Sequence, residues 1–249
     1  MKTKLALLVV LSLIQGSYAA PKTAKCLTEV SEYAMHASDS MQTNIGARQE
    51  RTVAETRKWL ETAKSANNWK EANLAYRSLM YMDKKIQLAA YSDSLLATAV
   101  KTGDDMLIGS AYLTKGIISN DLKKHREALN FYLLAERYLV KTGDAYSLYK
   151  LKYSIASTKC QIGMYTEAIA LFRQCVAYYE EENDRAYLNS LHYLGLCYNR
   201  NGDFALSKDT NLLGIKAGKE LGNTEMEAYF KHSLGVNSYF TKNYDLQSV

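Results

Sequence analysis

The chain has 249 residues and a formal net charge of +5, and 47% of its residues are hydrophobic, 23% charged and 11% aromatic. These fractions exclude a disordered or low-complexity chain, and the small, evenly mixed charge argues against nucleic-acid binding. A single proline and abundant alanine, leucine, lysine and glutamate indicate an all-helical protein, because proline breaks helices.

Residues 1–19 have the features of a secretory signal peptide. Two lysines precede an apolar stretch over residues 5–14, and Ser17 and Ala19 are small residues at the −3 and −1 positions of a cleavage site. The apolar stretch is far shorter than the roughly 20 residues that a membrane-spanning helix needs. The sequence therefore predicts an exported protein, periplasmic or secreted, with no membrane span after the leader is removed.

Residues 20–63 form an N-terminal segment that ends in a charge-rich helix, expected over 44–65. Val53, Trp59 and Leu60 lie on a thin apolar stripe of this helix, and most of its other residues are charged. A stack of helical repeats needs a polar outer face on its first helix. We therefore expect this helix to cap the N-terminal end of such a stack.

Residues 64–249 carry a repeat of about forty residues, marked by similar turns. The tetrapeptide Lys-Thr-Gly-Asp at 101–104 recurs at 141–144, and divergent copies follow at 181–184 and 221–224. In each copy, Gly or Asn can adopt the left-handed conformation that ends one helix, and Asp or Thr can cap the next. The predicted units are 64–103, 104–143, 144–183, 184–223 and an incomplete unit 224–249.

Each unit is expected to contain two helices. Apolar residues recur at three- and four-residue spacing over 148–162 and again over 167–179, which is typical of one helical face and excludes strand alternation. Gly163 is expected to end the first of these helices, and Thr166 to begin the second.

The spacing of small and aromatic residues resembles that of the tetratricopeptide repeat (TPR) family. In that family a small residue on the first helix is followed by alanine twelve residues later, an aromatic residue four further on and another small residue three beyond it. Two units show this pattern: Gly116, Ala128, Tyr132 and Ala135, then Ala156, Ala168, Phe172 and Cys175. The unit 184–223 matches less well, because Asn211 replaces the aromatic residue. The resemblance implies an all-α, right-handed, TPR-like solenoid of helical hairpins, with repeats of about forty residues instead of the usual 34.

Residues 64–249 are also similar to the extracytoplasmic repeats of membrane-bound helix-turn-helix transcriptional regulators (AraC or LuxR type) of Bacteroidota-type bacteria. The stretches 109–117 and 183–199 carry this similarity. In the last unit, Thr224 and Glu227 match a capping box, and a second helix is expected to begin about five residues before the end of the sequence. Two interpretations stay open: an exported interaction module, or a truncated periplasmic sensor region of such a regulator.

No pattern of catalytic or metal-binding residues is present. The sequence lacks a nucleophile elbow, a phosphate-binding glycine loop and a zinc-protease motif, and its four histidines are scattered. We therefore expect no enzymatic activity, cofactor or metal. The four cysteines are either disulfide-bonded in an oxidising compartment or small buried apolar residues: Cys26, Cys160, Cys175 and Cys197.

The TPR resemblance implies a protein or peptide partner bound in a groove lined by the first helix of each unit. With the small residue counted as position 8, the groove is lined by positions 2, 5, 9, 12 and 13. The candidate ligand-binding residues are Tyr153, Cys160, Asn189, His192, Asn199, Arg200, His232 and Tyr239, with Gln161 beside them. His192, His232 and Arg200 are predicted to receive a carboxylate, and Tyr153 and Tyr239 to offer flat apolar contacts. The alternative is that these are inward-facing residues with no ligand.

Overall fold

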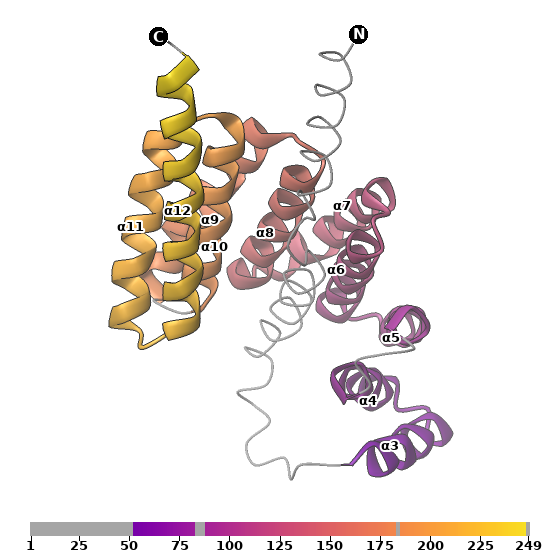
Figure 1. Cartoon of the computed structure of the whole chain (residues 1–249). Helices are drawn as coiled ribbons and strands as arrows, with labels where there is room; N and C mark the ends of the chain where they lie inside the picture. Colours follow the sequence, from indigo (N-terminus) through magenta and orange to yellow (C-terminus); the bar gives the residue numbers. More distant parts are fainter. Residues whose placement is uncertain (1–51, 83–87, 183–184, 248–249) are drawn as a thin grey trace, which may run out of the picture.

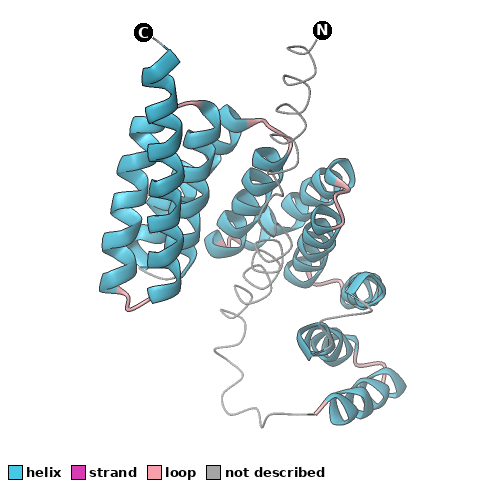
Figure 2. Cartoon of the chain, viewed as in Figure 1, coloured by secondary structure: helices cyan, strands magenta, loops and turns pink. Residues whose placement is uncertain are grey.

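The computed structural model describes residues 52–82, 88–182 and 185–247, which form helices joined by short loops and contain no strand (Figure 2). The predicted all-α, TPR-like solenoid of helical hairpins is confirmed. The predicted signal peptide and residues 20–51 lie outside the described residues. The helices are α3 (Val53–Ser65), α4 (Trp69–Met82), α5 (Leu88–Thr102), α6 (Asp105–Asp121), α7 (His125–Thr142), α8 (Ala145–Gln161), α9 (Tyr165–Glu182), α10 (Arg185–Asn201), α11 (Phe204–Glu220) and α12 (Thr224–Gln247).

The helices stack in chain order along an open, curved row (Figure 1). We call α4, α6, α8, α10 and α12 the first helices of their units, and α5, α7, α9 and α11 the second helices. Helices that are not consecutive contact each other mainly through the first helices: α6 with α8, α8 with α10 and α10 with α12. The row therefore curves toward the first helices. Among consecutive helices, α7 and α8 pack against each other least extensively.

The turns between units form as the sequence predicts. Gly103 and Gly143 have φ angles of 67° and 70°, a left-handed conformation that costs glycine little. Asp104 and Asp144 then accept hydrogen bonds from backbone N–H groups in the first turns of α6 and α8. Within the third unit, Gly163 follows the end of α8 with a φ of 84°. These residues end one helix and begin the next, so they set the lengths of the helices.

Small residues bring the paired helices together beneath aromatic rings. A methyl group added at Gly116 would lie 2.3 Å from a ring carbon of Tyr132, and one added at Gly214 would lie 2.2 Å from a ring carbon of Phe230. Tyr132 and Phe230 are themselves almost completely buried. Glycine is therefore required at both positions because an aromatic ring occupies the space of its missing side chain.

Asn211, which replaces the family's aromatic residue, is fully buried and makes polar contacts instead. Its Nδ2 donates to the backbone oxygen of Ser207 at 2.8 Å, and Ser207 Oγ donates to the oxygen of Gly195 at 2.9 Å. A polar pair within α11, with one hydrogen bond to α10, thus occupies the place where other units have a ring.

The N-terminal helix α3 begins at Val53, so its described part is shorter than the expected 44–65. Thr52 and Glu55 form a capping box, in which each side chain hydrogen-bonds the backbone of the other residue. Leu60 is buried against the core, and most charged residues of α3 are exposed. The predicted polar outer face is present.

The start of α12 differs from the prediction. Asn223, not Thr224, caps this helix: its Oδ1 accepts a hydrogen bond from the backbone nitrogen of Met226 at 3.0 Å. Glu227 forms an ion pair with Lys231 one turn further along the helix. The capping box predicted from Thr224 and Glu227 is therefore wrong, because asparagine is an equally good cap one residue earlier.

The second helix expected in the last unit is also not formed. α12 runs without a break from Thr224 to Gln247, 24 residues in all. No glycine or proline follows Gly235 in the sequence, so nothing ends the helix where the forty-residue spacing predicts a turn.

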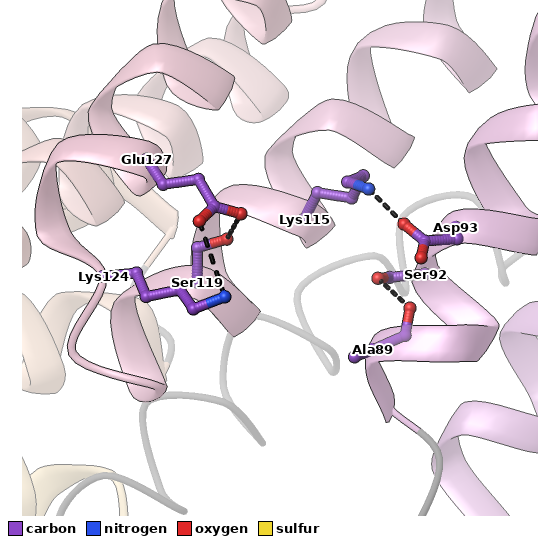
Figure 3. A network of polar contacts seen from close by, with 7 residues as sticks. All are labelled: Ala89, Ser92, Asp93, Lys115, Ser119, Lys124 and Glu127. Atoms are coloured by element: carbon purple, nitrogen blue, oxygen red, sulfur yellow. Dashed lines mark hydrogen bonds and ion pairs between the residues drawn. The ribbon is translucent and has the colours of Figure 1, made fainter.

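Polar contacts link α5, α6 and α7 at the surface (Figure 3). Lys115 of α6 forms an ion pair with Asp93 of α5. One turn further along α6, Glu127 of α7 accepts a hydrogen bond from Ser119 at 3.2 Å and lies 3.7 Å from Lys124. Solvent-exposed pairs of this kind contribute up to about 1 kcal/mol each, so burial of apolar side chains provides most of the stability.

Candidate ligand-binding surface

The predicted ligand-binding residues lie on three consecutive first helices, α8, α10 and α12, but their exposure differs. The buried ones are Tyr153 and Cys160, the half-buried ones Asn189, His192 and Asn199, and the exposed ones Arg200, His232 and Tyr239. We call the half-buried and exposed residues, together with the half-buried Gln161 and the buried Ser157 at groove position 9, the first-helix surface. That this surface binds a ligand stays a prediction.

Tyr153 lies in the core and not on the surface. Only 1% of it is exposed, and its ring meets Phe172 and Tyr193 edge-on, with centroid distances of 5.6 and 5.8 Å. These three rings join α8, α9 and α10. The position of Tyr153 in the repeat faces the groove, but its large ring turns into the interface between helices.

His192 is enclosed by three aromatic rings. The centroids of Tyr193, Tyr229 and Phe230 lie 5.6 to 5.9 Å from that of its imidazole. Burial, with a smaller contribution from the neighbouring His232, lowers the pKa of His192 to about 4. The imidazole is therefore neutral at pH 7, and it offers a ligand a hydrogen bond and no charge.

The low pKa of His192 predicts a loss of stability in acid. The ring titrates near 6.5 when the chain is unfolded and near 4 when burial disfavours its charged form. Between these pH values the unfolded chain binds the additional proton, so stability present above pH 6.5 is lost as the pH falls toward 4. From pH 7 to pH 4.5, His192 accounts for a loss of about 2.5 kcal/mol in the free energy of unfolding.

Urea titrations of the wild type and of His192→Gln at both pH values test this expectation. The variant keeps every other titrating group, so it should lose about 2.5 kcal/mol less than the wild type on acidification. Equal losses in the two proteins would show that His192 titrates normally in the folded state.

Four buried polar atoms of the first-helix surface lack a hydrogen-bond partner among the described residues. They are Ser157 Oγ and Gln161 Oε1 on α8, and His192 Nδ1 and Asn199 Nδ2 on α10. All four residues occupy groove positions of the repeat, namely 9, 13, 5 and 12. A buried polar group without a partner costs about 1–3 kcal/mol. These atoms are therefore candidates for hydrogen bonds to a ligand.

Ser157 was not singled out by the sequence, although its position 9 could have identified it. Serine carries no charge or ring that separates a ligand contact from an ordinary helical residue. Ser157 is distinguished only in the structure, where its hydroxyl is buried and has no hydrogen-bond partner among the described residues.

Buried polar atoms without hydrogen-bond partners also occur at groove positions of α4, near the other end of the described chain. Asn73 and Arg77 hold groove positions 5 and 9 when Tyr76 is counted as position 8. Asn73 Oδ1 and Arg77 Nη2 are buried and lack hydrogen-bond partners among residues 52–82, 88–182 and 185–247. Burial lowers the pKa of the Arg77 guanidinium, which nevertheless stays charged, as arginine does in proteins. Arg77 thus places a positive charge at a groove position of α4, as Arg200 does on α10.

The described residues contain no group of three or more His, Cys, Asp or Glu side chains arranged to hold a metal ion. In the same part of the chain, no helix is long and apolar enough to cross a membrane.

Solved structures with the same fold share little sequence with this chain. The crystal structure of BtubC (BKLC) from P. vanneervenii has a TM-score of 0.59 and 11% identity, covering 79% of this chain and 92% of BtubC. The crystal structure of a Rap protein complexed with Competence and Sporulation Factor has a TM-score of 0.60 and 14% identity, covering 89% of this chain and 62% of the Rap protein. The chain thus spans less than two thirds of the Rap protein. No protein-family model matches the sequence, and no curated protein matches it. The likeness establishes a TPR-like helical repeat fold.

Proposed function

We propose that the protein is a non-catalytic module that binds a peptide, or an extended segment of a protein, along its first helices. The observation that carries this proposal is the set of buried polar atoms without partners at groove positions of α8 and α10. An extended peptide presents backbone N–H and C=O groups at regular intervals, and these can satisfy such atoms along a row of helices. The fold supports the proposal, since a Rap protein of the same fold has been solved in complex with a factor that it binds.

The charges of this surface favour ligands that combine neutral hydrogen-bonding groups with a single carboxylate. His192 is neutral at pH 7 because burial lowers its pKa, so it contributes no positive charge. Arg200 is exposed beside Asn199 near the end of α10, and its guanidinium can form paired hydrogen bonds with a carboxylate. This narrows the earlier expectation of two histidines and an arginine, because His192 brings no charge to the carboxylate.

Binding of short peptides tests the proposal. An array of random peptides of about eight residues, probed with the full chain, identifies a binding peptide, and fluorescence anisotropy of a labelled copy then gives its Kd. Asn199→Ala and Arg200→Ala are each expected to raise Kd about 5- to 30-fold, because each removes one or two hydrogen bonds to the ligand.

Arg173→Ala is the matched control, since Arg173 is an exposed arginine on the second helix α9. It should bind the labelled peptide as the wild type does, and circular dichroism should show all three variants equally helical. Failure to capture any peptide, or an unchanged Kd in both Asn199→Ala and Arg200→Ala, would contradict the proposal.

We also propose that the module acts outside the cytoplasm, on the evidence of the signal-peptide features in residues 1–19. The resemblance to regulator sensor regions adds a second candidate role, in which ligand binding informs a membrane-bound transcriptional regulator. N-terminal sequencing of protein from its native cells tests export, which requires a chain that begins near residue 20. DNA sequence beyond the Val249 codon distinguishes the two roles, since a sensor region requires a transmembrane helix and a helix-turn-helix domain downstream.

A further inference from the structure

Two buried cysteines face each other across neighbouring units. Cys160 near the end of α8 and Cys197 in α10 are 5% and 0% exposed. Their sulfur atoms lie 2.7 Å apart, with the Cys197 thiol donating to Cys160. Sulfur atoms of separate thiols do not normally pack so closely, and a covalent disulfide brings them to about 2.05 Å. The fold thus places the two sulfur atoms close to the separation of a disulfide bond.

The third cysteine in the described part of the chain has different surroundings. Cys175 of α9 directs its thiol to the backbone oxygen of Tyr149, at 3.7 Å. Burial raises the pKa of the Cys175 thiol to about 12, which keeps it protonated and unreactive. Cys175 therefore serves as an internal comparison for the other two.

We propose that Cys160 and Cys197 form a disulfide bond that joins the first helices of two consecutive units. The bond links α8 directly to α10, across the hairpin completed by α9. It lies beside Gln161 and Asn199 in the sequence and so fixes the part of the first-helix surface that these residues occupy. The inference rests on the two sulfur atoms alone and does not depend on peptide binding.

The chemistry is thiol–disulfide exchange with an external disulfide, either a small molecule such as oxidised glutathione or a protein disulfide. The Cys160 thiolate attacks one sulfur of the external disulfide and releases one thiol, leaving a mixed disulfide. The Cys197 thiolate then attacks Cys160 Sγ, forms the internal bond and releases the second thiol. The two protein thiols are oxidised, the external disulfide is reduced to two thiols, and the two protein protons pass to them.

Electrostatics favours this order of attack. The hydrogen bond from Cys197 lowers the pKa of the Cys160 thiol, and the charge of Arg200 acts in the same direction. The same hydrogen bond, together with burial, raises the pKa of Cys197. Cys160 is therefore the attacking group, and Cys197 becomes reactive once its proton is no longer shared with a Cys160 thiolate.

The experiment counts free thiols in the full chain. Samples treated with oxidised glutathione or with dithiothreitol are denatured, alkylated with iodoacetamide, and weighed intact by mass spectrometry. The sequence contains four cysteines, so the reduced sample should carry four adducts and the oxidised sample two. Proteolysis of the oxidised sample should then yield one linked pair of peptides that contains Cys160 and Cys197.

Variants locate the bond and measure its effect. Cys175→Ala should keep the linked peptides, whereas Cys160→Ser or Cys197→Ser should abolish them. A crosslink that closes a loop of this length is expected to raise Tm by roughly 10 °C relative to the reduced chain. That difference should vanish in the Cys160→Ala, Cys197→Ala double variant.

Four adducts under both conditions would overturn the proposal. So would a linked peptide that contains Cys175 or Cys26, or a persistent glutathione adduct on Cys160, which would mean that Cys197 does not resolve the mixed disulfide. The thiol count of the wild type decides the question even if a variant fails to fold.

Discussion

Replacing Tyr153 with alanine is expected to lower the free energy of unfolding by about 3–5 kcal/mol, which is the usual cost of deleting a large buried ring. The ring of Tyr153 is buried between Phe172 and Tyr193, so its removal opens a cavity where α8, α9 and α10 meet. Urea unfolding followed by circular dichroism measures the change. Tyr153→Phe should recover most of the loss, because the ring contacts stay in place.

Tyr239→Ala is the matched control for this experiment. Tyr239 was predicted to share the ligand-binding role of Tyr153, but 57% of it is exposed on α12. Its replacement should change the free energy of unfolding by less than about 0.5 kcal/mol, as exposed positions usually do. Similar losses for the two tyrosines would show that Tyr153 does not support the core as we describe.

Gly116→Ala is expected to destabilise the protein by about 3 kcal/mol, although alanine is the better helix former. The added methyl group would meet the Tyr132 ring at 2.3 Å, and that ring is only 1% exposed. Overpacking of this kind costs about 1–3 kcal/mol and sometimes more. Thermal and urea unfolding of the purified variant give the measurement.

Gly235→Ala makes the same substitution at a position where the added methyl group meets no other atom. Gly235 lies within α12, and nothing comes within 4 Å of a methyl group added there. The variant should be more stable than the wild type by about 0.5–1 kcal/mol, the intrinsic helical preference for alanine. If both glycine variants changed stability in the same direction, the close contact at Gly116 would not be the cause.

The fold could be predicted because its boundaries depend on local chemistry. Glycine is favoured wherever a helix ends in the left-handed conformation, and an aspartate that follows can satisfy the free N–H groups of the next helix. Gly143 and Asp144 do this between α7 and α8. The spacing of Gly116 and Tyr132 similarly indicates which helices pair, because the ring packs over a small residue.

The site could be predicted only in part, because a position in a repeat specifies a direction and not an environment. Tyr153 and His192 both occupy groove position 5 of their units, yet the first lies in the core and the second is held neutral by surrounding rings. The proximity of Cys160 and Cys197 could not be predicted from the sequence, for another reason. These residues are 37 apart, not forty, so the repeat does not place them in equivalent positions, and only the packing of α8 on α10 brings them together.

Among consecutive helices, α7 and α8 have the least extensive contact, although apolar side chains of α6, α7 and α8 pack there in one cluster. A stack of helices bends most easily at its weakest junction, since the restoring force there comes from the fewest packed atoms. Slow, large-scale motion should therefore concentrate at the junction of α7 and α8. Such bending would change the distance between Arg77 on α4 and Arg200 on α10. The proposed binding surface would then accept peptides of different length.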